Sequence, residues 1–119
     1  MIKAYKIYTG SDGHSHVVEG TVLDNHLTHA NSIRFRETPA FSTYDWHPAP
    51  TIQYVLSFLG TLEFTMHSGE TFLLKPGEIL IAMDTTGSGH KWRLVDDQPW
   101  KRAYVTFDES QEINFQPTG

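Results

Sequence analysis

Residues 46–53 read WHPAPTIQ and residues 76–90 read PGEILIAMDTTGSGH, and these two stretches decide the fold. The first leads into a strand-like run that Gly60 closes. The second joins a Pro-Gly turn to an apolar run and then to a loop of small residues that ends at His90. The two stretches place His47, Gln53 and His90 where a small β-barrel would bring them together on its interior side.

The chain around these stretches alternates between short strand-like runs and turns. The runs are rich in β-branched and aromatic residues, and Gly, Pro, Asp and Ser separate them. They lie at 3–8, 16–22, 32–36, 41–46, 55–59, 62–66, 72–74, 79–83, 90–95 and 103–107. Short strands at this spacing predict an all-β sandwich or barrel.

Length and composition limit the class of protein. The 119 residues suit a single domain, 1–119, that buries roughly 65% of its unfolded surface. A net charge of −5 argues against a nucleic-acid partner, and the lack of cysteine excludes disulfides and thiolate ligands. No apolar run is long enough to span a membrane and no secretory signal is evident, so a cytoplasmic location is expected by default.

The strand period of two assigns residues to faces. The odd-numbered residues from His47 to Leu59 share one side of their run. In the run that begins at His90, Lys91 and Arg93 share a side that should face water, so the opposite side, which carries His90, is expected to face inward. The expected apolar walls of the pocket are Phe35, Val55, Met83 and Trp92.

Two of the runs are apolar on both faces, which predicts a homodimer. In the run 79–83 both the odd and the even residues are apolar, and Tyr54, Leu56 and Phe58 oppose the inward set of the other run. One barrel interior does not need both faces, so we expect the second face to contact another copy of the chain.

The residues around His47 and His90 resemble the two motifs of the cupin superfamily, over residues 41–108. In the first motif, about residues 41–60, His47 stands for the first histidine, while Ala49 and Gln53 replace the second histidine and the glutamate. In the second, about residues 76–95, the turn, strand and loop lead to His90. The resemblance implies a cupin-type antiparallel β-barrel, a double-stranded β-helix or jelly roll, of the small stand-alone kind.

The departures from the cupin pattern bear on metal binding. Many cupins hold one divalent transition metal (Fe, Mn, Ni or Zn) with three histidines and a carboxylate. Here the candidate ligands are His47, Gln53 and His90, with one imidazole and one negative charge fewer. The sequence leaves two alternatives, a weakened metal site or a metal-free, hydrogen-bonded cluster in a ligand pocket.

The predicted function is the binding of an oxygen-bearing small molecule and action on it, with the reaction left open because one fold hosts many chemistries. If the protein is an enzyme, His47 and His90 are the catalytic candidates, as ligands or as acid–base groups. The alternatives are a metal-free, non-catalytic module for small-molecule binding or sensing, and a structural homodimer with a vestigial pocket.

Other polar and terminal features are expected at the surface. Two histidine pairs have spacings seen in metal sites but lie in turn-rich segments, where exposure is the simpler expectation; they are His14 with His16 and His26 with His29. His67 lies in a hairpin turn, and residues 111–119 are expected to form a loosely held tail.

Overall fold

β-strands make up the regular structure of the chain. The computed structural model describes residues 1–118, which contain no helix and so no helical segment that could cross a membrane. The strands are β1 (Ile2–Thr9), β2 (Ser15–Val22), β3 (Ala30–Thr38), β4 (Thr43–His47), β5 (Gln53–Leu59), β6 (Leu62–Met66), β7 (Thr71–Leu74), β8 (Ile79–Ala82), β9 (His90–Leu94), β10 (Trp100–Phe107) and β11 (Gln116–Pro117). All the predicted runs overlap a strand, and β11 is additional.

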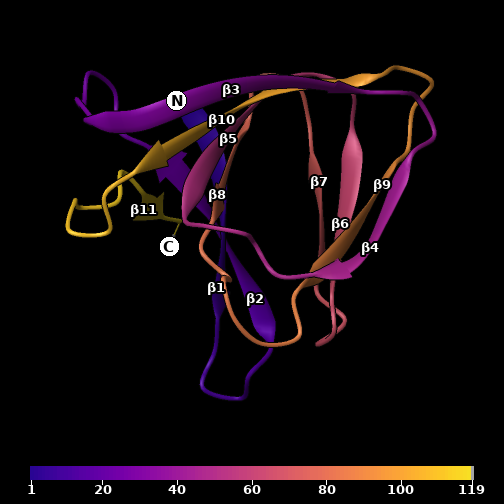
Figure 1. Cartoon of the computed structure of the whole chain (residues 1–119), viewed down its shortest axis with the longest axis horizontal. Coiled ribbons are helices and arrows are strands. Elements are labelled where there is room, and N and C mark those ends of the chain that lie inside the picture. The colour runs from indigo at the N-terminus through magenta and orange to yellow at the C-terminus, as the bar shows by residue number, and fades with distance from the viewer. Residues whose placement is uncertain (119) are drawn as a thin grey trace.

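The strands form two sheets that pack on one another (Figure 1). The larger has the order β11-β2-β1-β8-β5-β10-β3, and the smaller has the order β4-β9-β6-β7. Neighbouring strands run antiparallel, except for the parallel pair β1 and β8. The all-β class predicted from the sequence is confirmed.

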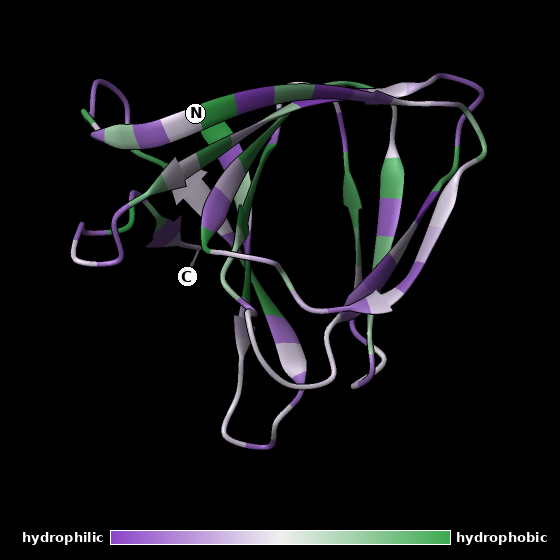
Figure 2. Ribbon diagram, viewed as in Figure 1, coloured by the Kyte–Doolittle hydropathy of each residue, from purple (hydrophilic) through white to green (hydrophobic). Residues whose placement is uncertain are grey.

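The main hydrophobic core lies between the two sheets. Tyr5 of β1 stacks on Phe72 of β7 with ring centroids 4.4 Å apart, and Trp92 of β9 meets Trp100 of β10 edge-on at 5.0 Å. Apolar and polar segments alternate along β6 (Figure 2), as expected for a strand with one face on a core. These cross-sheet ring contacts hold the sheets at a fixed separation.

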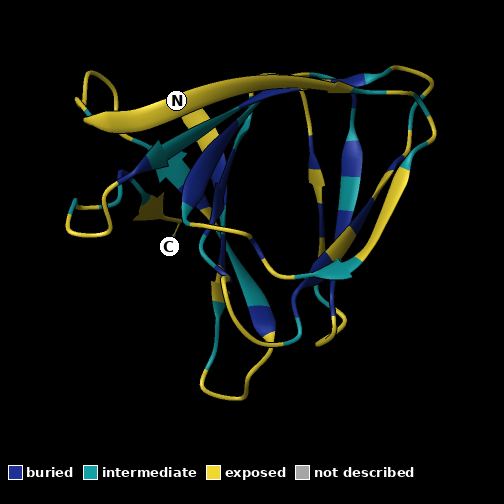
Figure 3. Ribbon diagram, viewed as in Figure 1, coloured by how far each residue is buried: buried dark blue, intermediate teal, exposed yellow. Residues whose placement is uncertain are grey.

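β9 shows the same alternation in its burial. His90, Trp92 and Leu94 are buried, whereas Lys91 and Arg93 are exposed (Figure 3). The inward direction predicted for His90 is therefore confirmed.

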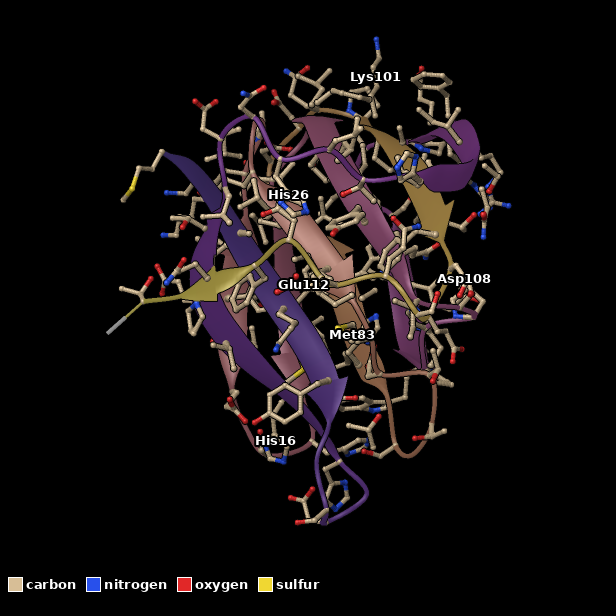
Figure 4. The ribbon with its side chains drawn as sticks, turned by 90° about the vertical axis from the view of Figure 1, so that its left-hand side faces the viewer. His16, His26, Met83, Lys101, Asp108 and Glu112 are labelled. Atoms are coloured by element: carbon tan, nitrogen blue, oxygen red, sulfur yellow. The ribbon has the colours of Figure 1, made fainter. Side chains whose placement is uncertain are left out.

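A second, smaller core covers the outer face of the larger sheet. Figure 4 looks onto this face, where the C-terminal segment carrying Glu112 crosses the strands beside Met83. The Asn114 backbone N–H donates to Tyr54 Oη at 2.9 Å, and Asn114 Oδ1 accepts the Leu23 N–H at 2.7 Å. The expectation of a loosely held tail is therefore wrong for residues 111–118, because side-chain and strand contacts anchor them; Gly119 lies outside the described residues.

This second core covers much of the apolar surface from which the sequence predicts a homodimer. The apolar outer residues of β5 and β8, from which the sequence predicts the dimer, pack in large part against the chain's own C-terminal segment, through Ile113 and Phe115. Phe58 stays exposed. The homodimer stays a prediction, and burial within one chain now explains most of the pattern behind it.

Candidate functional site

A cavity of about 320 Å³ opens between the two sheets and contains most of the predicted site. This volume lies within the range of about 300–1,000 Å³ typical of small-molecule pockets. The predicted site residues that line it are His47, Gln53, Val55, His90 and Trp92. Strands from both sheets therefore bring these side chains together around one cavity.

Phe35 and Met83, the other two predicted walls, lie elsewhere. Phe35 is 69% exposed on the edge strand β3, where the even-numbered Arg34 and Arg36 face the cavity instead. Met83 packs into the outer core, because the odd residues of β8 point away from the cavity. The inward direction predicted for Phe35 and Met83 is therefore wrong, and in each segment the even-numbered residues face the cavity.

His47 and His90 are direct neighbours across the pair β4 and β9. The two residues are partners in register, and their ring centroids lie 4.6 Å apart. The register shifts between Tyr44 and His47, where β4 carries an extra residue relative to β9. This irregularity turns His47 to the same side as His90.

His90 is held by a buried carboxylate. Its Nδ1 lies 2.6 Å from Oδ2 of Asp84, which also accepts a 2.6 Å hydrogen bond from Ser15 Oγ. Asp84 is fully buried. An ionised carboxylate only accepts hydrogen bonds, so the His90 Nδ1 carries a proton and Nε2 is left as the acceptor. Sequence reasoning missed Asp84, although its place six residues before His90 in the same loop is a signal that could have found it.

His47 is fixed in the same tautomer by the backbone. Its Nδ1 donates to the Asp45 carbonyl oxygen at 2.7 Å, which leaves Nε2 as an acceptor. Burial lowers the pKa of His47, and the neighbouring His90 lowers it further. The cavity therefore contains two neighbouring imidazoles, each anchored through Nδ1.

The donor set does not fit a tightly held divalent cation. Within residues 1–118, no three His, Cys, Asp or Glu side chains gather closely enough to hold a metal ion. The Asp84 carboxylate is hydrogen-bonded through Oδ2 to Ser15 and His90 and does not line the cavity, and the buried Gln53 contributes only a neutral amide. Two imidazoles and an amide form a weak donor set compared with the three or four protein ligands of typical metal centres.

Sequence reasoning also missed three arginines that line the cavity. They are Arg34 and Arg36 on β3 and Arg102 on β10. β3 is exposed along its length, and the apolar pattern of such an edge strand gives no signal for its inward face. Arg102 is 4% exposed, a rare environment for a charged side chain.

The other histidines lie outside the cavity. His14 bonds Ser88 through Nδ1, and His16 pairs with Asp12 and Glu70 at one end of the molecule (Figure 4). Three more, His26, His29 and His67, are exposed as predicted. His67 stacks on Trp46 with centroids 3.5 Å apart.

We expect His16 and His47 to titrate on opposite sides of the ordinary histidine pKa of about 6.5. The hydrogen bonds that His16 donates to the Glu70 carboxylate and then to that of Asp12 raise the pKa of His16, whereas burial lowers the pKa of His47. Proton–nitrogen NMR titration, with His16→Gln and His47→Gln to assign the signals, measures both values. Equal values for the two rings would contradict the geometry.

The two shifts have opposite effects on stability. The raised pKa of His16 stabilises the fold at low pH, and this contribution is lost as pH rises through the folded-state value. The lowered pKa of His47 favours the fold above about pH 6.5, and this contribution is lost as pH falls through the folded-state value. His16→Gln should therefore lose more stability relative to the parent at pH 5 than at pH 8, and His47→Gln should gain relative to the parent as pH falls.

Comparisons of the chain with known families and curated proteins found no match. What defines the class is the structure itself: an all-β protein of two packed sheets with two histidines and three arginines around one cavity.

Proposed function

We propose that the chain is a cupin-type protein whose cavity binds an oxygen-bearing small molecule, and that His90 accepts a hydrogen bond or a proton from a hydroxyl of that molecule. The buried pairing of His90 with Asp84 carries the proposal. A histidine whose other nitrogen is held by a carboxylate is the usual arrangement of a general base. His47, beside it, supplies a second acceptor for the same ligand.

The proposal of cupin-type architecture is supported by the order of the two motifs in the fold. The first motif crosses from β4 into β5, and the second crosses from β8 into β9. Both motifs contribute their histidine to one cavity, as the resemblance implies. Two packed and mainly antiparallel sheets are also the general architecture of a jelly roll.

Screening by thermal shift against hydroxyl-bearing compounds, namely polyols, phenols and hydroxy acids, tests the binding step. We expect ligands whose affinity falls about tenfold or more in His90→Ala, because a buried hydrogen bond to a ligand hydroxyl is lost. His26→Ala is the control, since His26 is exposed on the outer face (Figure 4). Affinity that is unchanged in His90→Ala, or a screen without any saturable ligand, would contradict the proposal.

Titration with Zn²⁺, Mn²⁺, Ni²⁺ and Fe²⁺ tests the metal alternative. From the donor set we expect none of them to survive dialysis against a weak chelator. A metal retained at one equivalent by the parent, and lost in His90→Ala but kept in His26→Ala, would make His90 a metal ligand and overturn its role as acceptor.

The second candidate is a non-catalytic binding module, which the neutral amide of Gln53 at a buried cavity position favours. Analysis of the recovered ligand separates the two. Hydroxyl ligands incubated with the protein and recovered for mass spectrometry should show a chemically converted product with the parent but not with His90→Ala. Tight binding without conversion would favour the binding module.

A further inference from the structure

Three guanidinium groups stand together on one wall of the cavity. Arg102 on β10 is the register partner of Arg36 on β3, and Arg34 pairs with Tyr104 two residues along. All four residues line the cavity. Like charges directly opposite one another on antiparallel strands destabilise a sheet, so this arrangement has a folding cost.

No carboxylate offsets this charge. The ion pairs formed within residues 1–118 include none of the three arginines. The described lining of the cavity contains no Asp or Glu. The chain as a whole carries a net charge of −5, so the positive charge of these three arginines is opposite in sign to the net charge of the protein.

Hydrogen bonds hold the Arg102 side chain through Nε and Nη1 and leave Nη2 of its guanidinium without a partner in the described part of the chain. Nε donates to Tyr104 Oη at 3.0 Å, and Nη1 donates to Thr38 Oγ1 at 2.6 Å and to the Trp100 carbonyl at 3.2 Å. The guanidinium also lies over the Trp100 ring, 3.9 Å from its centroid. These contacts use three of the five N–H donors, and the two on Nη2 have no partner in the described part of the chain.

Burial lowers the pKa of Arg102, and the nearby charges of Arg36 and Arg34 lower it further. Arginine nevertheless stays protonated in proteins, so a positive charge remains buried beside the cavity. A buried charge without a partner is costly, and an anion bound in the cavity would relieve that cost.

We propose that the cavity recognises a small organic acid, and that Arg102, assisted by Arg34 and Arg36 at the rim, binds its carboxylate or phosphate group. The planar guanidinium matches an oxoanion, and charge-assisted hydrogen bonds are the strong ones. This inference rests on the proposed function, because it names the ligand class of the same cavity. The acid group would meet Arg102 while a hydroxyl elsewhere in the ligand meets the imidazoles.

The test uses matched probes on the intact protein. Succinate and benzoate are each compared with the uncharged amide, succinamide or benzamide. Citrate and inorganic phosphate are titrated as further anions, and the fluorescence of the cavity residues Trp92 and Trp100 is the readout. We expect saturable binding of at least one acid, about tenfold or more tighter than its amide, and weaker at higher ionic strength. Binding of phosphate and not of carboxylates would identify a phosphate-bearing ligand by the same chemistry.

Variants then locate the site. Arg102→Met should weaken acid binding at least about tenfold, and Arg93→Met, which changes an exposed arginine paired with Glu63, should not. Because Arg102 is buried, the double variant Arg34→Gln/Arg36→Gln serves as a second test that does not disturb the core. The inference would be overturned if no acid bound saturably at concentrations up to about 10 mM, or if acid binding were unchanged in both Arg102→Met and Arg34→Gln/Arg36→Gln.

The two proposals fail in different ways. Acid binding that is lost in Arg102→Met but unchanged in His90→Ala would keep the anion site and reject the role of His90. Hydroxyl ligands that need His90 and bind equally well in Arg102→Met would keep the proposed function and reject the anion site.

Discussion

Gly89→Ala is expected to destabilise the protein by about 3 kcal/mol or more and to separate His90 from His47. Gly89 has a φ of +75°, which side chains other than glycine adopt at a cost. A Cβ added there would lie 2.3 Å from both the carbonyl carbon and the carbonyl oxygen of His47. These are backbone atoms of the neighbouring strand, so β4 and β9 would have to move apart. Urea denaturation measures the loss of stability.

Gly69→Ala is the matched control. Gly69 has a similar φ of +92°, but a Cβ there would meet nothing within 4 Å. Gly69→Ala should lower the free energy of unfolding by only about 1 kcal/mol, because only the positive φ is unfavourable for alanine there. Equal losses in the two variants would show that the contact between Gly89 and His47 does not limit the approach of the two strands.

The candidate site was only partly predictable from the sequence. A period of two locates the strands. In β9 the charged Lys91 and Arg93 mark the outside, and in the other motif Gln53 shares the odd parity of His47, so His47, Gln53 and His90 could be placed together. β3 and β8 lack such a marker: β8 is apolar on both faces and β3 is an exposed edge strand. The parities of Phe35 and Met83 therefore could not be read from hydrophobicity.

The groups that complete the site were hidden for a different reason. The buried Arg102 breaks the rule that arginine faces water, which is the rule that correctly placed His90, whereas Arg34 and Arg36 line the cavity from the exposed strand β3. A residue that breaks the general pattern is invisible to an argument built on that pattern, and such exceptions are expected at functional sites. Asp84 was hidden because it lies in a loop, where strand alternation assigns no direction.

The C-terminal segment could not be predicted because its anchors are single contacts. Asn114 and Tyr54 are 60 residues apart, and a single side-chain hydrogen bond between distant residues leaves no periodic trace in the sequence. The apolar outer face of β5 and β8 was visible, but periodicity does not say whether the same chain or a second copy covers it. The segment from Ile113 to Phe115 covers much of it.

Asp84→Ala is expected to be the most damaging change to the site itself. Asp84 is fully buried and accepts from both Ser15 and His90, so its removal leaves two buried donors without a partner. Losing one member of a buried, charge-assisted pair typically costs about 3–5 kcal/mol. The matched control is Asp24→Ala at an exposed position, which should change stability by less than about 0.5 kcal/mol.

Asp84→Asn separates the structural role of the carboxylate from its effect on His90. The amide preserves shape, so this variant should retain more stability than Asp84→Ala. An amide can also present its NH₂ group to the imidazole, and His90 would then lose the acceptor that keeps its proton on Nδ1. We expect the His90 tautomer signal in proton–nitrogen spectra to change in Asp84→Asn and to stay as in the parent in Asp24→Ala. An unchanged signal in Asp84→Asn would mean that packing around the ring, rather than the carboxylate, fixes the orientation in which His90 presents Nε2 to the cavity.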